Sequence, residues 1–201
     1  MSAPSPEPRE DHRGMDAHNA VMREIRGLNE QSYAPDVPTR VWMDEDNTPT
    51  GVVRSLTIIM NTGGCRWARA GGCTMCGYVA ESVEGGTVAH ADLMAQIDVA
   101  LAHERDAAET PAGQVKIYTS GSFLDDREVP PETREAIATR LGPRARIVLE
   151  SLPACVEPQT LRPFLDQGMA TDIAIALETS SDRIRRNAVN KYFGYEAFEQ
   201  P

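Results

Sequence analysis

Three of the four cysteines, Cys65, Cys73 and Cys76, lie within twelve positions of the chain. Their spacing is Cys-x7-Cys-x2-Cys, and several glycines surround them. In a protein without a secretion signal, such a group favours metal binding or catalysis over disulfide formation. Three thiolates can hold three irons of a four-iron cluster, which leaves the fourth iron open to another ligand. The spacing therefore predicts a [4Fe-4S] cluster on these cysteines.

Two other interpretations of the cysteines stay open. A structural zinc site needs four ligands, and Cys155 or His90 could supply the fourth. Such sites usually combine two short Cys or His motifs, and this sequence has no second motif. The cysteines could also be ordinary buried thiols, although these rarely cluster. Cys155, which is far from the others, is expected to be a packed thiol near a strand end.

The cysteine segment follows the first of four apolar strands that are expected to alternate with helices. The strands are predicted at 56–60, 115–119, 147–149 and 173–177, and the helices at 91–104, 131–141, 158–167 and from 182 onward. This alternation predicts an α/β fold with a parallel sheet. Each strand runs into small or polar residues at its carboxyl end, which is where such sheets place their sites.

The first fifty residues are expected to lie outside this sheet. Residues 1–14 are polar and Pro-rich, which predicts a disordered tail. Residues 15–50 are expected to form an extension, with a helix over 15–28 and then a turn-rich stretch up to Gly51. Residues 51–201 would then hold the α/β domain.

The composition limits the classes of function. The net charge of −10 argues against a nucleic-acid site that relies on bulk positive charge. No apolar run reaches membrane length and the N-terminus does not resemble a signal peptide, so we expect a cytoplasmic protein. Only Lys116 and Lys191 are lysines. An acidic, Lys-poor surface suggests a cell with high internal salt, which a stability curve against KCl tests.

The cysteines and the strand ends together resemble the radical S-adenosylmethionine enzymes. The usual gap between the first two cysteines in that family is x3, and the x7 gap is similar to the branch of the Elongator catalytic subunit. Three blocks, at 73–78, 116–125 and 176–182, look most like the archaeosine-synthesis radical enzymes (RaSEA). The resemblance covers about residues 40–198. It implies a partial (βα) TIM-like barrel with about four βα units, whose last two strands have no counterpart here.

The resemblance also implies contacts to S-adenosylmethionine, from residues Tyr78, Ser120, Gly121, Ser122, Glu150 and Glu178. The turn at 120–122 would contact the amino group through carbonyls or hydroxyls, because the family's usual acidic residue is absent there. Glu178 matches the ribose-contacting position, Glu150 is a further candidate, and Tyr78 could flank adenine. The alternatives are helix-start carboxylates for the two glutamates and core packing for the tyrosine.

The implied reaction is radical cleavage of a C–N bond in a tRNA base, a lysine-adducted deazaguanine, which leaves the amidine of archaeosine. The implied partners are tRNA, the archaeosine synthase subunit that attaches lysine, and an electron donor. Another tRNA base is a second possible substrate, and a non-catalytic zinc-stabilised binding module is a third interpretation. Arg66, Trp67 and Arg69 could contact RNA or simply form a solvated loop. The missing strands predict either a longer protein or completion by a second polypeptide.

Overall fold

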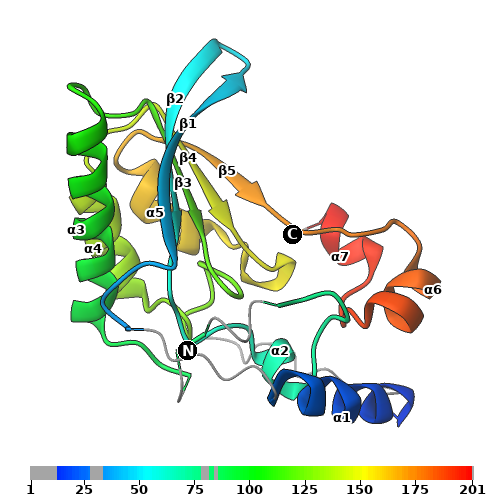
Figure 1. Ribbon diagram of the computed structural model, residues 1–201. Coiled ribbons are helices and arrows are strands. Elements are labelled where there is room, and N and C mark those ends of the chain that lie inside the picture. Colours follow the sequence, from blue (N-terminus) through cyan, green and yellow to red (C-terminus); the bar gives the residue numbers. More distant parts are fainter. Residues whose placement is uncertain (1–12, 28–33, 78–81, 84–85, 201) are drawn as a thin grey trace.

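A computed structural model shows a mixed α/β protein with one five-stranded sheet (Figure 1). The structure describes residues 13–27, 34–77, 82–83 and 86–200. The strand order in the sheet is the order in the sequence, and β1 is antiparallel to β2, whereas β2 to β5 are parallel. The strands are β1 (Arg40–Thr48), β2 (Gly51–Ile59), β3 (Gln114–Tyr118), β4 (Arg146–Glu150) and β5 (Ala170–Ala174).

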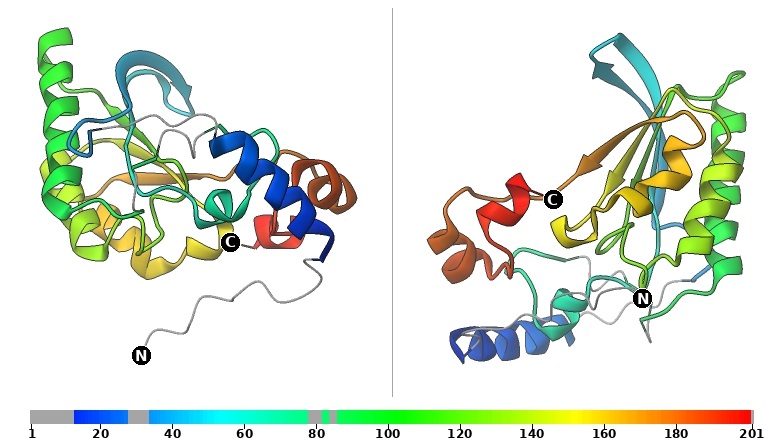
Figure 2. Two further views of the ribbon diagram at one scale, coloured as in Figure 1. Left: turned by 60° about the horizontal axis from the view of Figure 1, so that its bottom comes forward. Right: turned by 180° about the vertical axis from the view of Figure 1, so that it is seen from behind.

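The helices form two groups on different sides of the sheet. One group consists of α3 (His90–Ala107), α4 (Pro131–Leu141) and α5 (Pro158–Leu165), and these helices lie against one face (Figure 1). The other group lies beyond the carboxyl ends of the parallel strands (Figure 2) and consists of α1 (Arg13–Gly27), α2 (Arg66–Ala70), α6 (Asp182–Ile184) and α7 (Tyr195–Glu199). Two short elements accompany them, the 3-10 helix η2 (Pro153–Cys155) and the π-helix η3 (Arg185–Val189).

The core lies between the sheet and α3, α4 and α5. Alternate residues of the central strands, such as Ile117 on β3 and Ile147 on β4, are fully buried there together with Leu93 and Ile97 of α3. Because parallel strands next to a helix layer lose their water on that face, apolar residues stabilise this arrangement. The four parallel strands and three of the four predicted helices are therefore confirmed as elements. At 182, where the fourth was predicted to begin, the structure has only the three-residue α6, followed by η3.

Two details of the sequence prediction are wrong. The stretch from 40 to 48, predicted as turns, is the edge strand β1, and it pairs with β2 over its full length. Its acidic residues suit an edge strand because Asp44 and Asp46 form ion pairs with Lys116 on β3, at 3.1 and 2.6 Å. The last strand lies at 170–174 rather than 173–177, since β5 ends level with Glu150 of β4, its parallel neighbour.

The predicted N-terminal helix is present, but it begins at Arg13, two residues inside the predicted tail. The rest of that tail, residues 1–12, lies outside the described part of the protein. Of the helices that the structure describes, none combines the length and apolar character needed to span a bilayer.

Candidate functional site

The cysteine loop, residues 65–76, leaves β2 through two buried polar residues, Asn61 and Thr62. Cys65 is the N-cap residue of α2, while Cys73 and Cys76 follow this short helix. The loop lies beyond the carboxyl ends of the parallel strands, next to α1 (Figures 1 and 2). The structure thus places the three cysteines on the side of the sheet that the sequence predicts.

The three thiols are partly buried and influence one another electrostatically. Burial raises the pKa of Cys65, while hydrogen bonds from the backbone N–H groups of Ala68 and Trp67 to its sulfur lower it in part. Burial raises the pKa of Cys73 to about 11, and the neighbouring Cys76 and Cys65 add to this effect while Lys191 opposes it. A cation such as Lys191 and backbone N–H donors are the groups that stabilise thiolate sulfur.

The thiols do not form a ready-made metal site. Within the residues that the structure describes, no group of three His, Cys, Asp or Glu side chains has the arrangement needed to hold a metal ion. His90, one of the possible fourth zinc ligands, is hydrogen-bonded to Thr133 of α4 at 2.9 Å. The donor set, three thiols on one Gly-rich loop, is of the kind that holds an iron–sulfur cluster.

The turn after β3, residues 120–122, contacts the cysteine loop directly. Gly121 lies so close to Cys65 that a Cβ atom on it would be 2.8 Å from the Cys65 backbone N and Cα and 2.3 Å from a carboxylate oxygen of Glu128. Real Cβ atoms do not tolerate such distances, so only glycine permits this approach. Sequence reasoning selected Gly121 through its family position, and the structure shows why a glycine is needed.

Glu128 is a candidate residue that sequence reasoning missed. It is buried, accepts a hydrogen bond from the Ser122 backbone N–H at 2.6 Å and is also hydrogen-bonded by the Thr62 hydroxyl. Burial raises the pKa of this carboxyl. The motif at 120–122 itself contains no acidic residue, but Glu128 reaches the turn from six residues downstream of Ser122. No sequence spacing signals this, because the connection depends on how the intervening loop folds.

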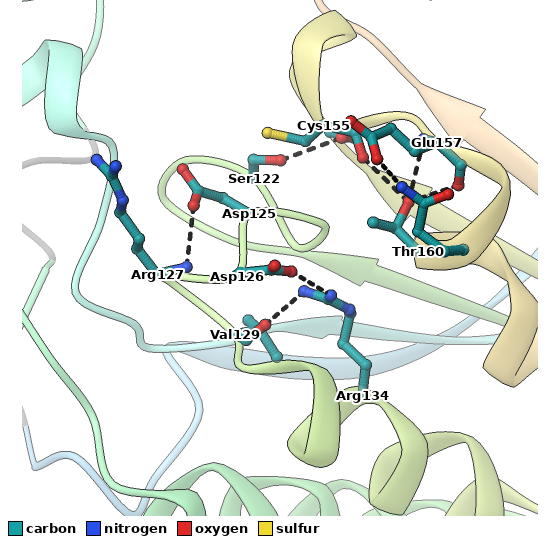
Figure 3. Close-up of polar contacts among 11 residues, drawn as sticks. Ser122, Asp125, Asp126, Arg127, Val129, Arg134, Cys155, Glu157 and Thr160 are labelled. Carbon is teal, nitrogen blue, oxygen red and sulfur yellow. Dashed lines mark hydrogen bonds and ion pairs between the residues drawn. The ribbon is translucent and has the colours of Figure 1, made fainter. Parts of the chain in front are cut away.

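The loop from 122 to 129 lies beside η2, the short helix after β4 (Figure 3). Asp125 accepts the Arg127 backbone N–H, while Arg134 of α4 bonds to Asp126 and to the Val129 carbonyl. These contacts anchor the loop to the helix layer and so fix the position of Glu128 at its end.

Cys155 lies on η2 and packs against the core. Burial raises its pKa, and its thiol is hydrogen-bonded to the Ser122 hydroxyl. Ser122 also bonds to Ser151 at 3.1 Å and accepts the Leu152 backbone N–H. Cys155 is thus a packed thiol near the end of β4, as the sequence predicts.

The two glutamates chosen from the sequence occupy different environments. Glu150 ends β4, accepts the Thr119 backbone N–H at 3.2 Å, and has its pKa raised to about 7, chiefly by burial. Glu178 does not lie at a strand end, because β5 stops at Ala174. It has a left-handed φ of 64° and pairs with the buried Lys191 at 3.3 Å. Non-glycine residues rarely adopt this conformation, and it often occurs at functional sites.

Residues 188–191 are joined to the cysteine loop by four hydrogen bonds. The Thr74 backbone N–H donates to the Val189 carbonyl at 2.9 Å, and the Thr74 hydroxyl donates to Ala188 at 2.8 Å. Asn190, buried and in the left-handed region, donates to the Gly72 carbonyl at 2.8 Å. Its own carbonyl accepts the Trp67 ring N–H at 2.7 Å. Residues more than a hundred positions apart are therefore joined at the site.

Helix α1 holds the same loop from another side. Asn19 accepts a hydrogen bond from Asn190 at 2.8 Å, His18 bonds to Thr74 at 3.1 Å, and Arg23 donates to the Ala70 carbonyl. Gly71, with φ of 138°, fits against Asn19, where a Cβ would come within 2.4 Å. Sequence reasoning assigned no site role to α1 or to 188–191, since the contacts depend on tertiary structure alone.

The remaining predicted residues fall in several places. Tyr78 lies outside the described residues. Trp67 packs against Tyr192 with a ring distance of 5.5 Å, and Arg69 donates to the Gly63 and Val83 carbonyls. Arg66 is exposed and forms an ion pair with Asp125 at 3.4 Å. The interpretation of this segment as a simple solvated loop therefore does not describe Trp67 or Arg69, which are structural.

Comparison with known proteins shows an extended similarity. The sequence is 38% identical to archaeosine synthase subunit beta of Methanosarcina acetivorans over 186 residues, which is 90% of this chain, or 53% of that protein. It is 31% identical to the protein of the same name from Thermococcus kodakarensis over 156 residues, 75% of this chain, or 47% of that protein. An uncharacterized protein of Methanocaldococcus jannaschii is 35% identical over 162 residues, 77% of this chain, or 44% of that protein.

The chain spans about half the length of the curated relatives that it matches. No family model matches it, and no solved structure does. The match to the Methanosarcina protein omits about a tenth of this sequence. It includes the cysteine loop and the turn at 120–122, because both lie farther from either end of the sequence than the omitted tenth can reach.

A separate surface hollow of about 560 Å³ lies between α3 and α4, lined by residues such as Met94 and Glu135. It is on the helix layer, away from the carboxyl ends of the strands. Because no cysteine and no candidate carboxylate from the strand ends lines it, the strand-end edge is the better candidate site.

Proposed function

We propose that this protein provides the cofactor-splitting half of a radical S-adenosylmethionine enzyme that acts in archaeosine formation on tRNA. The observation that carries the proposal is the contact between the cysteine loop and the turn at 120–122, where Gly121 lies against Cys65. The similarity to two proteins named archaeosine synthase subunit beta supports the choice of pathway. The order of β2 to β5, each next to its predecessor, is compatible with the first strands of a (βα) barrel.

In this proposal Cys65, Cys73 and Cys76 hold a [4Fe-4S] cluster. When bound and reduced by an electron donor, the cluster would supply the electron that cleaves S-adenosylmethionine into methionine and a 5′-deoxyadenosyl radical. The protein's own part is to hold the sulfurs, through α1 and 188–191, and to keep water from the loop. Lys191 and the N–H groups at Trp67 and Ala68 stabilise negative charge on the sulfurs.

The strand-end carboxylates would bind the cofactor's polar groups. Glu128 and the turn at 120–122 lie next to Cys65 and are proposed to receive the amino group, since a buried carboxylate favours an ammonium partner. Glu150 and Glu178 are proposed to accept ribose hydroxyls, and Tyr78 to flank adenine. The substrate would be a lysine-adducted deazaguanine in tRNA, supplied by a partner that attaches the lysine. Breaking a C–N bond in the lysine adduct leaves the amidine of archaeosine.

The first test is the colour and metal content of the protein purified without oxygen. We expect a brown protein with about four irons per molecule and broad absorbance near ~400 nm from sulfur-to-iron charge transfer. Cys73→Ala should abolish the colour, because it removes one of three ligands. Cys155→Ala is the matched control and should keep the colour, because its thiol bonds to Ser122 instead.

The second test is release of 5′-deoxyadenosine from S-adenosylmethionine by the reduced protein. Glu128→Gln should lower this release while the iron content stays the same, since the residue is proposed to bind the cofactor and no iron. A colourless protein with stoichiometric zinc would contradict the radical proposal and favour a binding module. If 5′-deoxyadenosine were released with another tRNA base but not with the deazaguanine adduct, the radical chemistry would stand and only the proposed substrate would change.

A further inference from the structure

Positive charge gathers on one part of this acidic protein. We define the cap as α1, the cysteine loop and residues 182–200, which lie together beyond the strand ends (Figures 1 and 2). The cap contains nine Lys or Arg and five Asp or Glu, while the rest of the sequence has eleven and twenty-five. A net positive cap on a protein of net charge −10 is a strong local asymmetry.

The cap's basic residues divide into structural and free ones. Arg185 is fully buried, pairs with Asp182 at 3.0 Å and donates to the Leu177 and Thr179 carbonyls. Lys191 is buried and pairs with Glu178. In contrast, Arg183 and Arg186 are exposed, and no ion pair or hydrogen bond involves their side chains in the described part of the protein. Their guanidinium groups are available to an external anion.

These two arginines lie in one continuous helical turn. Ser181 caps α6 through a hydrogen bond from the Ile184 backbone N–H, and the turn continues into η3. Arg183 on α6 and Arg186 on η3 are three positions apart in this continuous turn, and both are exposed. Between them, Arg185 is buried and paired with Asp182, so within this turn the exposed positive charge belongs to Arg183 and Arg186.

Aromatic surface lies in the same cap. Tyr192 is 36% exposed and its ring lies 5.5 Å from that of Trp67 on α2. Exposed aromatic rings next to arginines can stack on unpaired bases, whereas the arginines bind phosphates. The cap thus combines free guanidinium groups, a partly exposed ring and the cysteine loop within one continuous hydrogen-bonded unit.

We propose that the cap is an RNA-binding surface on which Arg183 and Arg186 contact backbone phosphates close to the cysteine loop. The idea extends the proposed function, on which the identity of tRNA as ligand rests. The acidic remainder of the protein repels the same polyanion, so the charge asymmetry would orient RNA toward the loop. This explains how a protein of net charge −10 can bind a nucleic acid.

The test measures binding of a fluorescently labelled tRNA transcript by anisotropy, over a series of KCl concentrations. The variant Arg183→Gln/Arg186→Gln should bind about tenfold more weakly at low salt, and its slope of log Kd against log[KCl] should fall by about 2. The matched control is Arg105→Gln/Arg162→Gln, which removes the same charge from exposed residues of α3 and α5. It should bind like the unaltered protein, and circular dichroism checks that both variants fold.

Each outcome decides the proposal. Equal affinity for the cap variant and the unaltered protein overturns it, as does equal weakening in both variants or absence of tRNA binding by the unaltered protein. The visible absorbance is measured on the same samples. A brown protein that does not bind tRNA would be consistent with the proposed cluster chemistry but would contradict the proposed RNA-binding surface. A colourless protein whose tRNA binding depends on the two arginines would support the RNA-binding surface but contradict the proposed cluster chemistry.

Discussion

The helix layer and the cap of this protein are held together in different ways. In the layer, the sheet and α3, α4 and α5 bury continuous apolar surface, together with the buried ion pair of Arg144 and Glu104 at 2.7 Å. In the cap, α1, the cysteine loop and 188–191 are joined by hydrogen bonds, such as those from Asn190 to Asn19 and from Thr74 to Val189.

The difference concerns both energy and function. A fully buried aliphatic side chain contributes about 1.5–3 kcal/mol, whereas one hydrogen bond contributes about 1 kcal/mol net. The layer should therefore determine global stability, and the cap should open locally without unfolding the sheet. Such a division would let the cysteine loop adjust around the proposed cluster without disturbing the sheet.

The largest expected effect is a loss of global stability when a buried side chain of the layer is shortened. Ile117→Ala on β3 should lower the free energy of unfolding by about 2–5 kcal/mol, since Ile117 is fully buried and a cavity would remain. Val52→Ala, at a position 65% exposed on β2, is the control and should change it by less than about 0.5 kcal/mol. Urea denaturation followed by circular dichroism measures both. Similar losses for the two variants would contradict the conclusion that apolar burial in the layer determines global stability.

The second expected effect is a pH dependence of stability caused by Glu150, which ends β4 at the boundary between the layer and the cap. Its folded-state pKa of about 7 exceeds the ordinary 4.5, so the folded protein keeps a proton that the unfolded state has lost. Stability from this group is therefore present below pH ~4.5 and declines as the pH rises to ~7. Glu150→Gln should remove that decline, on the order of 2 kcal/mol, in unfolding measured across this pH range. Parallel curves of unfolding free energy against pH for the two proteins would show that folding does not raise the pKa of Glu150.

The smallest expected effect is local to the cap. Asn190→Gly keeps the left-handed backbone but removes the amide that bonds to Gly72 and Asn19, which should cost about 1 kcal/mol. Hydrogen exchange at the Thr74 N–H should become roughly fivefold faster, while exchange in β3 is unchanged. Asn187→Gly, at an exposed position of η3, is the control. Faster exchange throughout β3 would mean that cap and layer unfold together.

The sequence predicted the layer because its signal is local. The apolar run at 115–119, the Pro at the start of α4 and the Gly142 after its end each act within a few residues. The strand β1 was missed for the same reason. Its acidic residues indicate turns locally, and only the ion pairs of Asp44 and Asp46 with Lys116 explain them in a strand.

The sequence alone determined the cysteine spacing, the parallel strands and the position of the loop after β2, since each follows from periodicity or from the order of residues. Tertiary structure decided that Glu128 reaches the turn at 120–122 and that Asn190 bonds to the cysteine loop. It also decided that Arg185 is buried while Arg183 and Arg186 are exposed. These pairings join residues distant in the sequence, and a linear pattern contains no information about which distant side chains meet.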